Sequence, residues 1–243
     1  MPCLPPHLNR RELIKSAAGF LLVSGVAASV LGNTAAFAAG PLPQITRPRK
    51  ATNRISLVGD SLTSGAEPYQ DRAFASAGWS SSAIDAYRSR GVLTKIAADP
   101  HNGITAVDAI RAADGDTDVW VVALGTNDAG IYAARHYPDV INAMVDHIGS
   151  QHVVVWVNIY LPETPARQDA WNFALGVVAA ERPGLIVFDW ATVAAANPDW
   201  IGKDKIHYSP IGYEYRANAV ALATAPLAPD TSQPISSEDT RRN

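Results

Sequence analysis

The sequence predicts an α/β fold in which helices alternate with the strands of a mostly parallel sheet. Its 243 residues, 47% of them hydrophobic and 18% charged, suffice for one domain with a substantial core. Residues 118–124 are almost continuously apolar, as in strands that are buried on both faces of a sheet. Residues 104–113 instead place Ile104, Val107 and Ile110 on one helical face.

Each expected strand is a short apolar run that ends at turn residues. In chain order, the expected strands are residues 55–59, 81–86, 118–124, 152–160 and 184–190. The helices expected between them are residues 68–76, 92–97, 104–113, 137–148 and 166–181. A final helix is expected to begin after Ser209, a favourable N-cap, with Pro210 at its first position.

The amino-terminal segment has the features of a secretory signal. The pair Arg10–Arg11 precedes an apolar run at 17–30, and the alanines at 36 and 38 fit a signal-peptidase site. Residues 1–38 are therefore predicted to be a twin-arginine signal peptide that directs export to the periplasm, the cell wall or the medium. An uncleaved membrane anchor is the alternative, but the apolar run is shorter than the roughly 20 residues that a span prefers.

The composition of the remaining chain limits its partners and its chemistry. Residues 39–53 are expected to be a linker, 54–228 the folded domain and 229–243 a disordered tail. Without residues 1–38 the chain has 17 basic and 22 acidic residues and no basic run, so nucleic acid is not an expected partner. The single cysteine, Cys3, lies in the signal segment, which excludes a disulfide, a thiolate nucleophile and a Cys-based zinc site from the mature protein.

Three turns carry the candidate chemistry: Ser61 after the first strand, residues 125–128 after the third, and residues 204–207 before the final helix. The carboxyl ends of parallel strands point the same way, so these turns are expected to converge at one edge of the sheet. A serine hydroxyl is a weak nucleophile that requires a base, and His207 is the candidate. Asp204 is placed to hold the imidazole in one tautomer and to stabilise its charged form.

Acyl transfer also places negative charge on a carbonyl oxygen, which needs hydrogen-bond donors. The backbone N–H of Ser61 and the side-chain amide of Asn127 are the candidates. Taken singly, each motif has a simpler interpretation: Ser61 as a helix N-cap, Asn127 as a turn former and residues 204–207 as a surface loop. The three motifs together, in this order, favour the catalytic interpretation.

Other kinds of site have less support in the sequence. His147 and His152 lack a third ligand and are interpreted as surface residues rather than metal ligands. The residues after Gly59 lack the glycine spacing of a phosphate- or dinucleotide-binding loop. Neither a metal nor a cofactor is therefore expected.

The motifs Gly-Asp-Ser at 59–61, Gly-x-Asn-Asp at 125–128 and Asp-x-x-His at 204–207 resemble blocks I, III and V of the SGNH (GDSL) hydrolase superfamily. The resemblance implies a flavodoxin-like three-layer α/β/α sandwich. It implies a catalytic triad of Ser61 as nucleophile, His207 as base and Asp204 as the residue that orients the base. It also implies that the Ser61 N–H and the Asn127 side chain are oxyanion donors.

Block II of the family usually offers a glycine N–H as a third donor, and here the sequence departs from the pattern. Residues 84–91 occupy this place, and Ser89 lies nearest the expected glycine. A serine can serve because the donor is a backbone group, with Gly91 and, more distantly, Gly103 as the alternatives. Residues 84–91 and 187–213 also resemble the SGNH domains of bacterial cell-wall O-acyltransferases.

The function implied by the resemblance is an exported serine esterase that cleaves small, acetyl-type acyl esters through an acyl-serine intermediate, with carbohydrates among the expected carriers. An O-acyltransferase that moves an acyl group to a cell-wall glycan hydroxyl is the first alternative. A non-catalytic glycan-binding module is the second. The expected partners are small-molecule or glycan esters, without stable insertion into a membrane.

Overall fold

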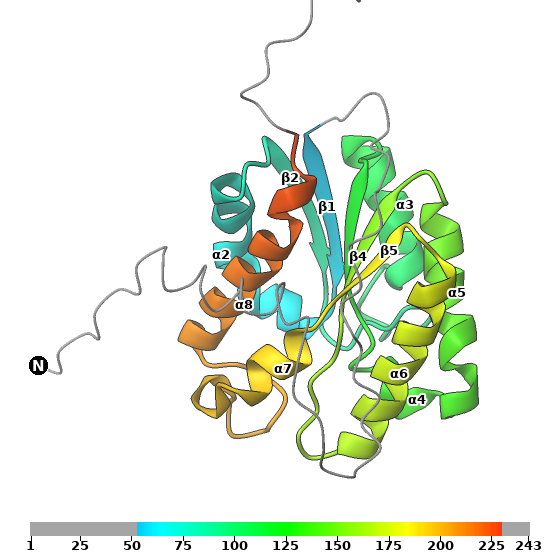
Figure 1. Ribbon diagram of the computed structural model, residues 1–243, viewed down its shortest axis with the longest axis vertical. Helices are drawn as coiled ribbons and strands as arrows, with labels where there is room; N and C mark the ends of the chain where they lie inside the picture. The colour runs from blue at the N-terminus through cyan, green and yellow to red at the C-terminus, as the bar shows by residue number, and fades with distance from the viewer. Residues whose placement is uncertain (1–52, 230–243) are drawn as a thin grey trace, which may run out of the picture. The chain divides into compact units, whose positions relative to one another are not determined.

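The computed structural model describes residues 53–229, which form one sheet with helices on both faces (Figure 1). The predicted signal peptide at 1–38, the predicted linker up to residue 52 and the predicted tail from residue 230 lie outside the described residues. Within residues 53–229 no helix combines the length and the apolar character that crossing a membrane requires.

The sheet confirms the predicted α/β class, and each of its neighbouring strand pairs is parallel. The strands are β1 (Arg54–Gly59), β2 (Ser81–Ala86), β3 (Val119–Ala123), β4 (Val153–Val157) and β5 (Leu185–Phe188). They lie in the order β2-β1-β3-β4-β5, so β1 and β3 are central neighbours. Leu57 of β1 pairs with Ile84 of β2 on one side and with Val121 of β3 on the other.

Two layers of helices cover the sheet, as in a three-layer sandwich (Figure 1). The longer helices are α2 (Ser61–Ser76), α3 (Gly103–Asp114), α5 (Tyr137–Ile148), α6 (Pro165–Glu181) and α8 (Pro210–Thr224). The chain moves from β1 to β2 in one direction and from β2 to β3, β4 and β5 in the other. Right-handed crossovers therefore place α2 on one face, where it packs against α8, and α3, α5 and α6 on the opposite face.

Shorter helices lie between these elements. They are α4 (Asp128–Ile131), η1 (Ala134–His136), α7 (Trp190–Ala195), η2 (Pro198–Trp200) and η3 (Ala225–Leu227). In Figure 1, α4 and α7 lie towards the lower edge of the sheet, at the carboxyl ends of the strands.

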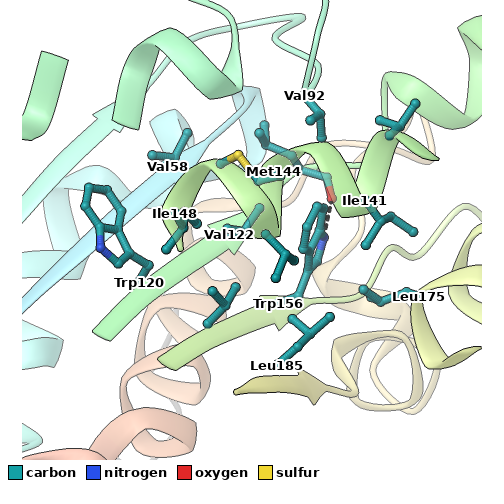
Figure 2. Packing of buried hydrophobic residues seen from close by; sticks show 14 of the residues in the cluster. Val58, Val92, Trp120, Val122, Ile141, Met144, Ile148, Trp156, Leu175 and Leu185 are labelled. Carbon is teal, nitrogen blue, oxygen red and sulfur yellow. Dashed lines mark hydrogen bonds between the residues drawn. The ribbon is translucent and has the colours of Figure 1, made fainter. Parts of the chain in front are cut away.

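The main hydrophobic cluster fills the space between the sheet and the layer of α3, α5 and α6 (Figure 2). Successive strand residues point to opposite faces, so Trp120 and Val122 belong to this cluster while Val121 belongs to the other face. Trp156 of β4 is fully buried there, and its indole N–H donates to the carbonyl of Leu124 at 2.9 Å. This bond holds the end of β3 immediately before the turn that contains Asn127.

Two predicted helices differ from the structure. The helix predicted at 68–76 begins already at Ser61, because Asp60 caps it, and Pro68 lies inside it. Residues 92–97 were predicted to be helical but form a loop. In such a helix the carbonyl of Val92 would accept the N–H of Ile96, but it accepts that of Ile104 at 3.2 Å instead. The strand predicted at 184–190 ends at Phe188, and α7 begins at Trp190.

Gly125→Ala is expected to lower the free energy of unfolding by about 2–5 kcal/mol, because backbone strain and overpacking add. Gly125 has a φ of +126°, and a Cβ there would lie 2.4 Å from Nε1 of Trp171. Chemical denaturation of both proteins measures the difference. The matched control is Gly78→Ala, at a φ of +100°, where a Cβ would lie 3.6 Å from its nearest neighbour. Equal losses in the two variants would contradict the contribution of packing.

Candidate active site

The turn after β1 brings Ser61 to the first position of α2. A Cβ at Gly59 would lie 2.1 Å from Oγ1 of Thr63, so only glycine fits between the strand and the helix. The carboxylate of Asp60 caps the helix by accepting the N–H of Leu62 at 2.9 Å. The first N–H groups of a helix lack partners within the helix. That of Ser61 has no hydrogen bond to any residue between 53 and 229, so it is free to bind a ligand.

The imidazole of His207 lies between Ser61 and Asp204. Its Nε2 is 3.0 Å from Oγ of Ser61, and its Nδ1 is 2.6 Å from Oδ2 of Asp204. Oδ1 of Asp204 accepts the backbone N–H groups of Ile206 at 3.1 Å and of His207 at 2.9 Å, in a turn where Lys205 has a φ of +60°. The bond from the His207 ring, followed by these two N–H groups, lowers the pKa of Asp204 to about 2. The carboxylate therefore stays charged at neutral pH beside the imidazole.

Aromatic side chains anchor the loop that carries His207. Ile201 and Tyr208 form an antiparallel bridge across its base. The indole N–H of Trp190 in α7 donates to the buried hydroxyl of Tyr208 at 2.7 Å, and the ring of Trp190 stacks on that of Trp200. These contacts join three separate segments, so the sequence analysis did not identify them.

Asn127 lies in the turn after β3, directly before α4. Its amide donates to the carbonyl of Arg90 at 2.9 Å and lies 3.4 Å from Oδ2 of Asp60. The second contact is longer than an ordinary N–H···O bond. One N–H of Asn127 is therefore held in place while the other can turn to a stronger acceptor beside Ser61.

Among the three candidates for the third donor, only Ser89 has a backbone N–H without a hydrogen bond in the described part of the chain. The N–H of Gly91 donates to the carbonyl of Thr94 at 2.8 Å, and that of Gly103 to the carbonyl of Gly91 at 2.9 Å. Ser89 has a φ of +58°, which is uncommon for serine, and lines the same pocket as Ser61. The geometry therefore favours Ser89.

A buried ion network holds the loop after β2. The side chain of Arg90 is 1% exposed, donates twice to Asp99 at 2.9 and 3.0 Å, and lies 2.8 Å from Asp85. Asp85 in turn contacts Nδ1 of His101 at 3.0 Å. The sequence does not reveal this network, because mixed charges in a loop ordinarily indicate a solvated surface. Its consequence for the site is a fixed Arg90 carbonyl, the acceptor for Asn127.

Asp128, directly after Asn127, is a fully buried carboxyl group. Its Oδ1 accepts the N–H of Val92 at 2.9 Å, while its Oδ2 has no hydrogen bond within residues 53–229. Burial, with the charge of nearby Asp60 as a further cause, raises the pKa of Asp128 to about 7. Burial also raises the pKa of Asp60. Folding therefore increases the proton affinity of both groups, which lie beneath the turns that carry Ser61 and Asn127.

The three turns open into one pocket of about 560 Å³. Ser61, Ser89, Asn127, Asp204 and His207 all line it, and so does Leu161 after β4. The described residues contain no group of three or more His, Cys, Asp or Glu side chains that could hold a metal ion. His152 is not the surface residue that was predicted, because it is 8% exposed and lies 3.2 Å from Asp116.

Residues 57–215 match the GDSL-like Lipase/Acylhydrolase family. The chain belongs to this family. The match confirms the resemblance predicted from the three motifs and the assignment of the protein as a serine ester hydrolase. No significant match was found among curated protein sequences.

Several solved structures have a fold similar to that of this GDSL hydrolase. The C-terminal catalytic domain of peptidoglycan O-acetyltransferase A (OatA) from Streptococcus pneumoniae is 22% identical over 74% of this chain and 98% of that one, with a TM-score of 0.57. A carbohydrate esterase family 3 protein from Talaromyces cellulolyticus is 18% identical over 72% and 97%, with a TM-score of 0.58. The esterase EstA from Pseudoalteromonas sp. is 14% identical over 72% and 96%, with a TM-score of 0.52. At these identities the likeness shows the fold alone.

Asp128→Asn is expected to flatten the dependence of stability on pH. Folded Asp128 keeps its proton up to about pH 7, whereas an unfolded chain loses it near the ordinary value of 3.8. The free energy of unfolding should therefore fall as the pH rises between these values, by on the order of 2–4 kcal/mol. The asparagine keeps an oxygen for the Val92 N–H and removes this fall.

Denaturant unfolding at several pH values between about 4 and 8 measures the slope. The matched control is Asp139→Asn, which neutralises a side chain that is 81% exposed, and it should leave the slope close to that of the wild type. A wild-type slope in Asp128→Asn would show that burial of this carboxyl group does not control the pH dependence.

Proposed function

We propose that this GDSL hydrolase is an exported esterase that removes small, acetyl-type acyl groups, with carbohydrates as carriers, through an acyl-enzyme on Ser61. The observation that carries the proposal is the line of contacts from Oγ of Ser61 through the ring of His207 to Asp204, at 3.0 and 2.6 Å. A hydroxyl, an imidazole and a carboxylate in this order form the arrangement that activates a serine nucleophile.

In the first half of the reaction, Oγ of Ser61 attacks the ester carbonyl while Nε2 of His207 takes the hydroxyl proton. The charged imidazole is stabilised by Asp204, whose low pKa keeps it ionised. The negative charge on the former carbonyl oxygen is met by the N–H groups of Ser61 and Ser89 and by the amide of Asn127. Collapse of this intermediate breaks the bond to the alcohol, which leaves with the proton from His207.

In the second half, water replaces the alcohol. His207 takes a proton from the water while the water oxygen forms a bond to the acyl carbon. The same donors stabilise the second oxyanion. The acyl–Ser61 bond then breaks, the carboxylic acid leaves, and the proton on His207 returns to the serine. No further group is required for the balance of atoms and charge.

An O-acyltransferase would form the same acyl-enzyme and resolve it with a glycan hydroxyl in place of water. Two structural neighbours are named as a peptidoglycan O-acetyltransferase and a carbohydrate esterase. These names support an acylated glycan as the substrate of an esterase or as the product of a transferase. A glycan-binding module without activity would not need His207 aligned between Ser61 and Asp204, so their contacts speak against it.

Amino-terminal sequencing tests the export that is part of this proposal. Protein secreted by an expressing bacterium is expected to begin at Ala39, after the Ala-Phe-Ala segment at 36–38. A receptor reads the arginine pair, so replacement of Arg10 and Arg11 by lysine should reduce secretion. Exported protein that retains the apolar run at 17–30 would contradict cleavage.

Ser61→Ala is expected to abolish release of acid from p-nitrophenyl acetate and from acetylated xylan. Asn127→Ala should lower kcat by roughly 10²–10³-fold, because one oxyanion donor is lost while the nucleophile and its base remain. The matched control is Asn197→Ala, since Asn197 donates to Val193 at the end of α7 and does not line the pocket. It should retain wild-type turnover.

The products decide between hydrolysis and transfer when a soluble glycan acceptor is present. Free acid as the sole product agrees with the esterase, and acylated glycan agrees with the transferase. Labelled glycan binding without turnover, together with no reaction of Ser61 with a phosphonate, would support the binding module. A wild-type kcat in Asn127→Ala would remove its assignment as an oxyanion donor.

A further inference from the structure

Three cationic side chains line the pocket that contains Ser61. Arg88 comes from the loop after β2, Arg167 from the first turn of α6, and Lys205 from the turn between Asp204 and His207. Two carboxylates also line the pocket, Glu163 and the ionised Asp204, so the three cations still outnumber them. The pocket thus has an excess of positive charge, although the chain as a whole carries a net charge of −3.

The three cations have no ion pair or side-chain hydrogen bond within residues 53–229. Arg88 has a single ring contact, 5.8 Å from the centre of Tyr87. By contrast, Arg90 beside the pocket is bound by two carboxylates. Unpaired charges of one sign in a concave site concentrate the electrostatic field there and attract ligands of the opposite sign.

Arg167 has the best-defined position of the three. Its Nη1 lies 3.8 Å from the place that a Cβ of Gly130 would occupy, so the guanidinium lies against the turn that follows Asn127. Its charge also opposes the increase that burial causes in the pKa of Tyr137. The hydroxyl of Tyr137 donates to Ala129 in the same turn. Both observations place Arg167 beside the turn that follows Asn127.

We propose that the pocket selects esters that carry a carboxylate close to the scissile bond, and that Arg167 is the main group that binds it. The guanidinium offers paired N–H donors that match the two oxygens of a carboxylate, while Arg88 and Lys205 add positive charge. The inference rests on the proposed esterase function and names its substrate class. The carboxylate belongs either to the acyl chain or to the alcohol, and the same cations recognise both.

Two matched pairs of esters test this inference on the full-length protein. For the alcohol side, 4-acetoxybenzoate is compared with its neutral methyl ester. For the acyl side, the mono-p-nitrophenyl ester of adipic acid is compared with the corresponding p-nitrophenyl methyl diester. The measured quantity is kcat/KM for each ester, after subtraction of the uncatalysed rate.

Arg167→Gln is expected to lower kcat/KM for the anionic member of at least one pair about tenfold more than for its neutral partner. The members of a pair differ in intrinsic reactivity, so the ratio between them is compared across variants. Arg72→Gln is the matched control, because it removes the same charge from an exposed position of α2 that does not line the pocket. This control should keep both values within about twofold of the wild type.

A change of ratio confined to the benzoate pair places the carboxylate on the alcohol, and one confined to the adipate pair places it on the acyl chain. Equal losses for both members of both pairs in Arg167→Gln overturn the inference while the esterase function stands. The same change of ratio in Arg72→Gln also overturns it. Wild-type protein that hydrolyses none of the four esters overturns the proposed function, and the substrate class with it.

Discussion

The contact between Ser61 and His207 joins residues 146 positions apart, and it depends on a sheet whose strands all run in the same direction. Parallel strands place all their carboxyl ends at one edge. Ser61 follows β1 at the centre of the sheet, Asn127 follows β3 beside it, and His207 returns to this edge through the segment after β5. An antiparallel neighbour in place of β3 would send Asn127 to the opposite edge.

Buried titratable side chains hold the loops around the site in place through hydrogen bonds and ion pairs. Arg90 is desolvated between Asp85 and Asp99, and Asp128 is desolvated beneath the turn of Asn127. A buried ion that loses its partner is strongly destabilising. The ion pairs of Arg90 therefore disfavour other conformations of the loop after β2. Donors that are already in place need no reorganisation when charge develops on a substrate, which is the main electrostatic advantage of an enzyme over water.

Membership of the GDSL-like family gives the class of reaction, and the pocket lining is where this chain can differ from other members. The arrangement of Ser61, His207 and Asp204 suits the carbonyl of any ester and therefore does not distinguish one substrate from another. Arg88, Arg167 and Lys205 line the same pocket, and in the proposed selectivity they bind a charged group beside the carbonyl. In these proposals, chemistry and selectivity reside on different side chains of one cavity.

The sequence by itself determined the α/β class, the approximate place of all five strands and the three motifs, because apolar spacing and turn residues act over a few positions. Only the tertiary structure shows that the N–H of Gly91 is bonded to Thr94 while that of Ser89 is not bonded within residues 53–229, since these bonds depend on how the loop folds. The loop at 92–97 and the ion pairs of Arg90 could not be predicted from the sequence for the same reason. The burial of a side chain and the hydrogen-bond partner of an N–H group depend on segments that are distant in the chain. Local propensity does not contain this information.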